Sequence, residues 1–198
     1  YIANVPNQII SPGNNKPIIG IFQDSMIGSY LFTRKNVSFS KKDAMNLMLK
    51  TNIYQTQRLF DGNKASFTNF ELLSEIIPQI SLEYKTQLFK DHEQKETSNH
   101  ILNIKNGVIT RGQFNKEVLG SSSKGILHRA LKDFSVSQCK NFIDNLQNII
   151  TEYMKTTGFS VGISDLMANE NTNNEIEEII TKKKLEVSNL LDQVHLGI

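Results

Sequence analysis

The chain has 198 residues, 38% of them hydrophobic and 21% charged, with a formal net charge of +2. This length gives room for one or two soluble domains with a real core, and so small a charge provides no argument for nucleic-acid binding. The single cysteine excludes an internal disulfide, and no apolar run reaches the roughly 20 residues of a membrane span. The first residues lack both a signal peptide and an initiator Met, so we expect an intracellular protein and a piece of a longer chain.

The first part of the sequence predicts two short strands and three helices. Proline and glycine interrupt the first 22 residues, where the apolar runs 9–10 and 18–22 predict strands. Apolar residues at helical spacing predict helices over residues 23–33, 40–50 and 69–77. Ser40, three residues before Asp43, resembles a helix cap, and Pro78 is expected to end the third helix.

The middle of the sequence predicts antiparallel strands. Residues 81–89 partly alternate between apolar and polar side chains, and the polar residues 90–99 predict a mobile loop. Two apolar runs, 101–104 and 108–111, flank Asn106-Gly107. This dipeptide predicts a tight hairpin, because both residues accept a positive φ.

A glycine- and serine-rich break at residues 120–123 introduces a helical part. The sequence predicts one helix over residues 124–134. Ser135 and Gln138 resemble a capping box for the next helix, which is expected to end near Gly158.

The last forty or so residues are expected to form a connector and one long helix. Residues 159–167 are the connector, and Thr172 with Glu175 resembles a capping box at the helix start. Apolar residues between 176 and 194 form a stripe for which the chain offers no partner segment. The predicted fold class is therefore α+β, with strands, short helices and an Asn-Gly hairpin followed by a helical C-terminal part.

The residues alone predict no catalytic or metal centre. The four histidines are scattered without metal-ligand spacing, and Cys139 lies in an apolar helical pattern that favours an inert buried thiol. The glycine-rich residues 120–125 can bind phosphate through open amides, although a linker is the commoner interpretation. Residues 182–184, three lysines, can contact phosphate too, although a solvated helix face is more usual.

Five blocks of literal sequence carry more specific information. The blocks are residues 8–24, 31–34, 107–122, 124–128 and 158–165. Strings such as Gly20-Ile21-Phe22-Gln23-Asp24 and Gly158-Phe159-Ser160-Val161-Gly162, in this order and spacing, closely resemble the largest subunit of multisubunit DNA-directed RNA polymerases. One block would be weak evidence, but five in order extend the resemblance over essentially the whole chain.

The resemblance implies a place within that subunit. It implies that residues 1–158 form the pore domain, and that residues 159–198 form the junction and first long helix of the funnel domain. The family's magnesium-binding aspartate loop lies upstream of this region, and its trigger loop and bridge helix lie downstream. We therefore expect the fragment alone to be inactive and to hold no cofactor, with magnesium and structural zinc bound elsewhere in the complete enzyme.

The resemblance also implies site residues and partners. The candidates for contact with nucleotide or RNA in the channel are Lys116, Lys16, Gln23 and Asp24. The candidates for structural turns and junctions are Gly107, Gly120, Gly158, Gly162 and Asp165. The implied partners are other polymerase subunits, nucleoside triphosphates and the RNA 3′ end in the pore, and a transcript-cleavage factor at the funnel, with no membrane.

Several departures from the family pattern affect these expectations. The family often has two lysines in the turn after the hairpin, whereas Lys116 is followed here by Glu117. The segment 83–99 diverges, and Ser164 stands where glycine is more usual. This divergence and the Asn-, Ile- and Lys-rich composition favour a large DNA virus, with host cytoplasm or virion as location, over a fast-evolving eukaryote with a nuclear enzyme.

A different class of function stays open at this stage. The chain can instead be a free-standing interaction module that docks a regulatory partner through its C-terminal helix. The length of the encoded protein separates the two hypotheses, because the polymerase subunit is several times longer than this chain.

Overall fold

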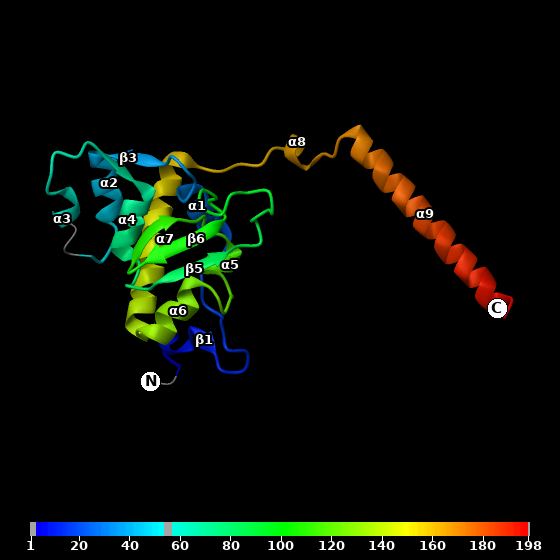
Figure 1. The fold of residues 1–198 in the computed structure, drawn as a ribbon, viewed down its shortest axis with the longest axis horizontal. Coiled ribbons are helices and arrows are strands. Elements are labelled where there is room, and N and C mark those ends of the chain that lie inside the picture. Colours follow the sequence, from blue (N-terminus) through cyan, green and yellow to red (C-terminus); the bar gives the residue numbers. More distant parts are fainter. Residues whose placement is uncertain (1–2, 54–56, 198) are drawn as a thin grey trace. The chain divides into compact units, whose positions relative to one another are not determined.

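The computed structural model describes residues 3–53 and 57–197. Internal contacts divide the chain into two units, Tyr1–Gly158 and Phe159–Ile198. Among the described residues every strand belongs to the first unit, which combines small antiparallel sheets with helices (Figure 1). The predicted α+β class is confirmed.

The largest sheet has three antiparallel strands in the order β5-β6-β7. These strands are β5 (Leu82–Lys85), β6 (Ile101–Lys105) and β7 (Val108–Arg111). Asn106 and Gly107 have φ values of 48° and 79°, which confirms the predicted hairpin turn. Gly107 also lies close to the chain after α4 (Asn69–Ile76), since a Cβ there would come 3.2 Å from the Gln79 Cα atom.

Two further sheets have two short strands each. In the first, β1 (Ile10–Ser11) pairs with β2 (Lys16–Pro17), and in the second, β3 (Ser38–Ser40) pairs with β4 (Ser66–Thr68). The strand predicted over residues 18–22 is wrong. There the Ile18 N–H donates to the Ile9 carbonyl at 2.8 Å and the Ile21 N–H to the Leu119 carbonyl at 3.4 Å, so the segment is fixed by separate contacts rather than by a ladder.

The predicted helices of the first unit are present, with small shifts at their ends. The helical elements are η1 (Val5–Gln8), α1 (Gln23–Phe32), α2 (Lys41–Met48), α3 (Gln57–Phe60), α4 (Asn69–Ile76), α5 (Lys116–Leu119), α6 (Ile126–Asp133) and α7 (Val136–Thr157). Ser40 and Ser135 cap α2 and α7 through their hydroxyl oxygens, as predicted. The sequence analysis missed α5, because one helical turn is too short to show a periodic pattern.

Helix α7 is the centre of the first unit. It packs against α1, α2, α4 and α6, and α4 packs in turn against β7 (Figure 1). Gly28 of α1 is required for the closest of these contacts, because a Cβ there would lie 2.4 Å from the Ile150 side chain. Phe32, Phe39 and Tyr153 form an aromatic cluster beside it, with ring centroids 5.1 to 5.9 Å apart.

The second unit consists of α8 (Ile163–Leu166) and α9 (Glu170–His195). The predicted start of the long helix at Thr172 is wrong. Asn169 caps it instead by accepting the Thr172 N–H at 2.8 Å, and asparagine is a better N-cap than threonine. Gly158 ends α7 with a φ of 64°, and the Gly162 N–H donates to the Asp165 carboxylate at 2.8 Å.

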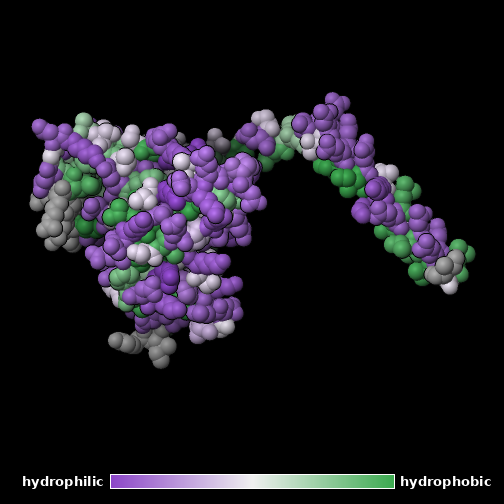
Figure 2. Space-filling model, in the orientation of Figure 1, coloured by the Kyte–Doolittle hydropathy of each residue, from purple (hydrophilic) through white to green (hydrophobic). Residues whose placement is uncertain are grey.

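The apolar stripe predicted along α9 is exposed. Its side chains, from Ile176 at 45% to Val194 at 71% exposure, contact no core of their own. Figure 2 shows apolar residues in green along α9, whereas the face of the first unit that is in view is mainly hydrophilic. Among the described helices, none combines the length and the hydropathy needed to cross a membrane.

Candidate functional site

Lysines from separate segments meet around one surface depression of about 430 Å³, which we call the lysine depression. Lys16 comes from β2, Lys116 from α5, and Lys124 from the loop before α6. The remaining lining residues are Gln87, Glu117, Ser121, Ser122 and Ser123. The depression therefore combines three cations with hydroxyl groups and one carboxylate.

Helix α5 places Lys116 at this surface. The Asn115 side chain caps the helix by accepting the N–H groups of Glu117 at 3.0 Å and Val118 at 3.1 Å. Val118 and Leu119 are completely buried, so the helix is anchored while the Lys116 side chain stays exposed. The prediction that Lys116 lies on a turn is wrong, because the asparagine cap and these two buried residues stabilise a helical turn instead.

Two glycines bring the serine loop close to α5. A Cβ at Gly120 would lie 2.4 Å from the Lys116 carbonyl oxygen, and one at Gly125 would lie 2.7 Å from the Val118 carbonyl oxygen. Only glycine permits such close backbone approach. The segment 120–125 is therefore folded against α5 rather than acting as a free linker.

Glu117 makes the depression less positive than three lysines alone. Its Oε2 atom accepts the Gln87 N–H at 2.9 Å, which links α5 to the segment after β5. Burial in the first place, and the nearby Glu117 charge in the second, raise the pKa of the Tyr84 hydroxyl above its ordinary value. The Glu117 carboxylate thus accepts a hydrogen bond within the fold, and its negative charge opposes the binding of an anion in the depression.

The structure brings together only part of the predicted channel set. Lys16 and Lys116 line the same depression, whereas Gln23 and Asp24 do not line it. Both of these lie exposed at the N-terminal end of α1. Lys124 was missed as a site residue, although its position at the end of the glycine- and serine-rich segment was a signal for it.

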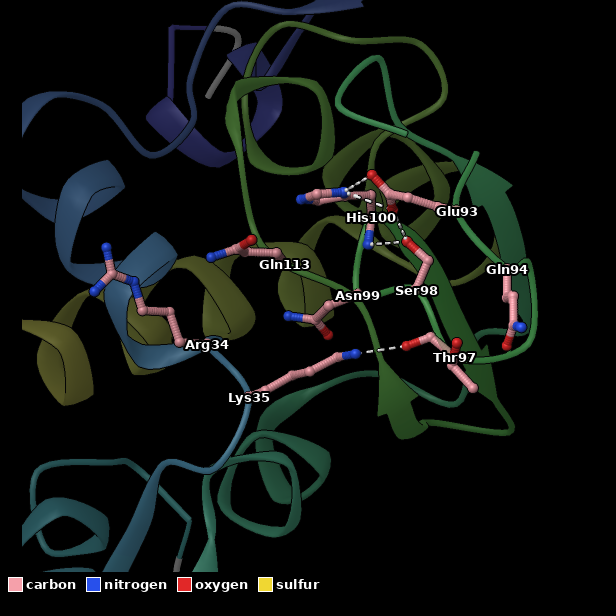
Figure 3. Close-up of a pocket in the computed structure, with 9 residues that line it drawn as sticks. All are labelled: Arg34, Lys35, Glu93, Gln94, Thr97, Ser98, Asn99, His100 and Gln113. Carbon is pink, nitrogen blue, oxygen red and sulfur yellow. Dashed lines mark hydrogen bonds and ion pairs between the residues drawn. The ribbon is translucent and has the colours of Figure 1, made fainter. Parts of the chain in front are cut away.

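A second cavity, of about 540 Å³, lies between the end of α1 and the loop before β6 (Figure 3). His100 Nδ1 lies 2.9 Å from a Glu93 carboxylate oxygen, and Ser98 donates to the same carboxylate. Lys35 Nζ donates to the Thr97 carbonyl at 2.6 Å. These charged groups already have partners within the fold. Their contacts therefore hold the loop before β6 in place, and the cavity is not our candidate binding site.

The contacts within this loop shift the pKa of the Glu93 carboxyl below its ordinary value. Its hydrogen bond from Ser98 lowers its pKa most, burial works against that shift, and the bond to His100 adds to it. Figure 3 shows Arg34 pointing away from this pair, and its guanidinium lies 5.7 Å from the Tyr30 ring centroid. The loop from Lys90 to Asn99 has neither helix nor strand, as predicted, and its mobility stays a prediction.

Within the described ranges, no group of three or more His, Cys, Asp or Glu side chains lies close enough to hold a metal ion. The magnesium and structural zinc that the family resemblance implies for the complete enzyme stay a prediction. The buried Cys139 thiol is chemically unreactive. Burial raises its pKa to about 11, which leaves it protonated at neutral pH.

Comparison with known proteins identifies the family. The model of the family described as RNA polymerase Rpb1, domain 3, matches residues 8–166. The chain is 24% identical to DNA-directed RNA polymerase II subunit RPB1-B of Trypanosoma brucei brucei, with 94% of this chain and 10% of that protein covered. It is 26% identical to the DNA-directed RNA polymerase RPB1 homolog of African swine fever virus, with 93% of this chain and 14% of that protein covered. The chain thus spans a small part of these relatives' length, and it belongs to the Rpb1 domain 3 family, a segment of the largest subunit of DNA-directed RNA polymerase.

Proposed function

We propose that the first unit forms part of the wall of the nucleotide-entry pore in an RNA polymerase, with the lysine depression facing the channel. The observation that carries this proposal is the meeting of Lys16 and Lys116 in one depression. The family resemblance implies a channel role for each lysine separately, and the two residues lie a hundred positions apart in the sequence. Nucleoside triphosphates entering the channel, and the RNA 3′ end when it moves back, both present phosphate groups to such a surface.

The charges of the lysine depression suit a surface for passage rather than for tight binding. In the part of the chain that the structure describes, none of Lys16, Lys116 and Lys124 forms an ion pair, so their ammonium groups are available to a ligand. A phosphate contact at such an exposed site is worth about 1 kcal/mol or less, and salt screens it. A weak attraction raises the local nucleotide concentration without trapping the nucleotide.

The wider proposal follows the family. The second unit would begin the funnel, the complete polymerase would add nucleotides to RNA, and its magnesium and zinc would be held by other segments. Other polymerase subunits, and a transcript-cleavage factor at the funnel, would be partners. The location would be intracellular: the host cytoplasm or virion for a viral enzyme, the nucleus for a cellular one.

One observation favours the alternative function of a docking module. The apolar side chains of α9, among them Leu190 at 60% exposure, are uncovered in this chain. An exposed stripe of this kind marks a surface that another segment or partner covers. Within a polymerase subunit, another part of the same long polypeptide would cover this stripe, whereas a docking module would bind a separate regulatory protein there. The two proposals therefore differ in what binds α9.

The proposal is tested in the complete polymerase with Lys116→Glu, compared with Lys42→Glu. Lys42 is another exposed lysine, on α2, that does not line the depression, and it serves as the matched control. We expect Lys116→Glu to raise the apparent KM for nucleotides, or to alter backtracking, by about threefold at low salt, because one exposed charge contact is lost and a repulsion replaces it. The effect should shrink at high salt. Elongation, pausing and transcript cleavage equal to those of the control at low salt would show that Lys116 is only a surface residue.

A further inference from the structure

A groove of about 500 Å³ lies on the first unit, where the end of α4 and the first half of α7 meet the segment after α2. The two helices pack against each other (Figure 1). The described residues give the groove two kinds of lining, apolar side chains and side-chain amides, and none of them is charged. The amides are those of Asn52, Gln79, Gln138, Asn141 and Asn145. We therefore call this surface the amide groove.

The floor of the amide groove belongs to the hydrophobic core. Phe142 of α7 is 1% exposed, and Ile76 and Ile77 at the end of α4 are 6% exposed each. Ile53 and Pro78, which are half-buried, extend the apolar lining. A concave site with an apolar floor and a few well-placed polar groups is typical of ligand sites, because the floor provides burial and the polar groups provide orientation.

One amide of the groove is buried and has only one half of its hydrogen-bonding capacity in use. Asn145 is 4% exposed, and its Oδ1 atom accepts the Asn52 N–H at 2.9 Å. The described residues provide no hydrogen-bond acceptor for its Nδ2 group. Unlike the Tyr84 hydroxyl, this group is not sealed from solvent, so a ligand in the groove can reach it. Asn145 is thus held in place through one atom and offers the other as a fixed donor.

The other four amides are exposed and form the rim of the groove. Among the described residues their side chains have no hydrogen-bond partner either. A side-chain amide both donates and accepts, and so does each peptide group of a main chain. The lining therefore matches the hydrogen-bonding pattern of a polypeptide backbone. An ionic ligand is disfavoured, because it would lose hydration without meeting an opposite charge.

We propose that the amide groove binds an extended, uncharged segment of another polypeptide. The segment places one apolar side chain on the floor, and its main chain forms hydrogen bonds with Asn145 and with the rim amides. A nucleobase can also pair with amides, but nucleotides and RNA carry phosphate groups for which the groove offers no cation. This inference is independent of the proposed function, because no residue of the lysine depression lines the amide groove.

Binding is measured by NMR titration of the isotope-labelled chain with three small probes. The first is the tripeptide Ala-Leu-Ala with an acetyl group and an N-methylamide at its ends, which is uncharged and apolar in the middle. The second has Glu in place of Leu, and the third is uridine, an uncharged nucleoside. We expect saturable shifts at Phe142, Asn145 and the rim amides with the first probe, and binding of the second that is weaker by about tenfold or more, because its carboxylate must lose hydration.

Two variants connect the binding to particular amides. Asn145→Asp keeps the oxygen that accepts the Asn52 N–H and replaces the donor by a second oxygen, so it should weaken binding of the leucine peptide by about tenfold. Asn141→Ala removes a rim amide from an exposed position of α7, where alanine favours the helix, so the fold is retained. It should weaken binding by about threefold. Asn148→Ala is the matched control, because Asn148 is exposed on the same helix and does not line the groove.

Three outcomes of the titration would overturn the inference. Uridine binding more tightly than the leucine peptide would assign the groove to a nucleoside. Equal binding of the leucine and glutamate peptides would show that the uncharged lining does not select the ligand. No saturable shift at the groove with any probe, or binding that Asn141→Ala and Asn148→Ala leave equally unchanged, would show that the amides hold no ligand.

The complete polymerase provides a second test, in which the natural segment is present. The variants Asn141→Cys and Asn148→Cys are alkylated with iodoacetamide, in the isolated chain and in the complete enzyme, and the rates are measured by mass spectrometry of the peptides that carry these positions. A bound segment should slow the reaction at position 141 by about tenfold or more in the complete enzyme and leave position 148 reactive. Equal rates at position 141 in both forms would show that the groove is empty. Equal protection of both positions would show that a larger surface covers α7, and it would refute an inserted segment.

Discussion

The buried Asn69 side chain provides the sharpest stability test of the fold. Asn69 is 3% exposed, and its Nδ2 group donates to the Phe32 carbonyl at 2.6 Å and to the Arg34 carbonyl at 3.1 Å. Helix α1 ends at Phe32, so these carbonyls have lost their helical partners. One amide thus connects the end of α1 to the start of α4 across the core.

The expected cost of Asn69→Ala follows from the hydrogen bonds of this side chain. The variant loses both bonds to the carbonyls and a third bond, which the Phe70 N–H donates to Asn69 Oδ1 at 2.9 Å. It leaves the buried Phe32 carbonyl without this partner, while the Arg34 carbonyl is partly open to water. The sum is about 2–3 kcal/mol of unfolding free energy, or roughly 5–10 °C in Tm for a domain of this size. Asn69→Asp should cost at least as much at neutral pH, because a carboxylate faces two carbonyl oxygens, and its deficit should shrink as acid protonates the carboxyl.

Urea unfolding of the chain followed by circular dichroism measures this cost. The matched control is Asn46→Ala, which changes an exposed asparagine on α2 and should leave stability within about 0.5 kcal/mol of wild type. The urea midpoint should fall in Asn69→Ala with an unchanged m-value. A loss no larger than that of the control would refute the bridging role of Asn69, and a changed m-value would show that the variant alters more than these hydrogen bonds.

Three further predictions concern the isolated chain. It should fold yet extend no primer in the presence of template, nucleotides and magnesium, since the described residues hold no metal-binding cluster; reproducible template-dependent synthesis would contradict this. The exposed stripe of α9 should make the chain self-associate or fray there, and Leu190→Glu with Leu191→Glu should sediment as a monomer; a monomeric wild type with α9 protected from hydrogen exchange would sink the idea. The Cys139 thiol ionises at a higher pH in the folded chain than in the unfolded one, so stability should fall as pH rises from about 9 to about 11. The fall should be smaller in Cys139→Ala, and an equal fall would exclude the thiol as its cause.

Local patterns predicted the elements whose signals lie within a few residues. Asn106-Gly107 predicted its hairpin because the turn needs two positive φ angles, and Ser40 and Ser135 predicted helix starts because each hydroxyl accepts an N–H three residues later. The start of α9 was placed at Thr172, three residues after the cap that the structure shows. Asn169 prevailed over Thr172 by its stronger capping tendency, which a pattern of spacings alone does not rank.

The sequence by itself determined the α+β class, most helix limits, the Asn-Gly hairpin and, through its literal strings, the polymerase family. It did so because capping, turn geometry and helical spacing depend on neighbours along the chain. Only the tertiary structure decided that Lys16, Lys116 and Lys124 meet, and that Gln23 and Asp24 do not line the same depression. These are contacts between distant segments, and they are fixed by which side chains are buried, such as Val118 of α5, rather than by the spacing of residues in the sequence.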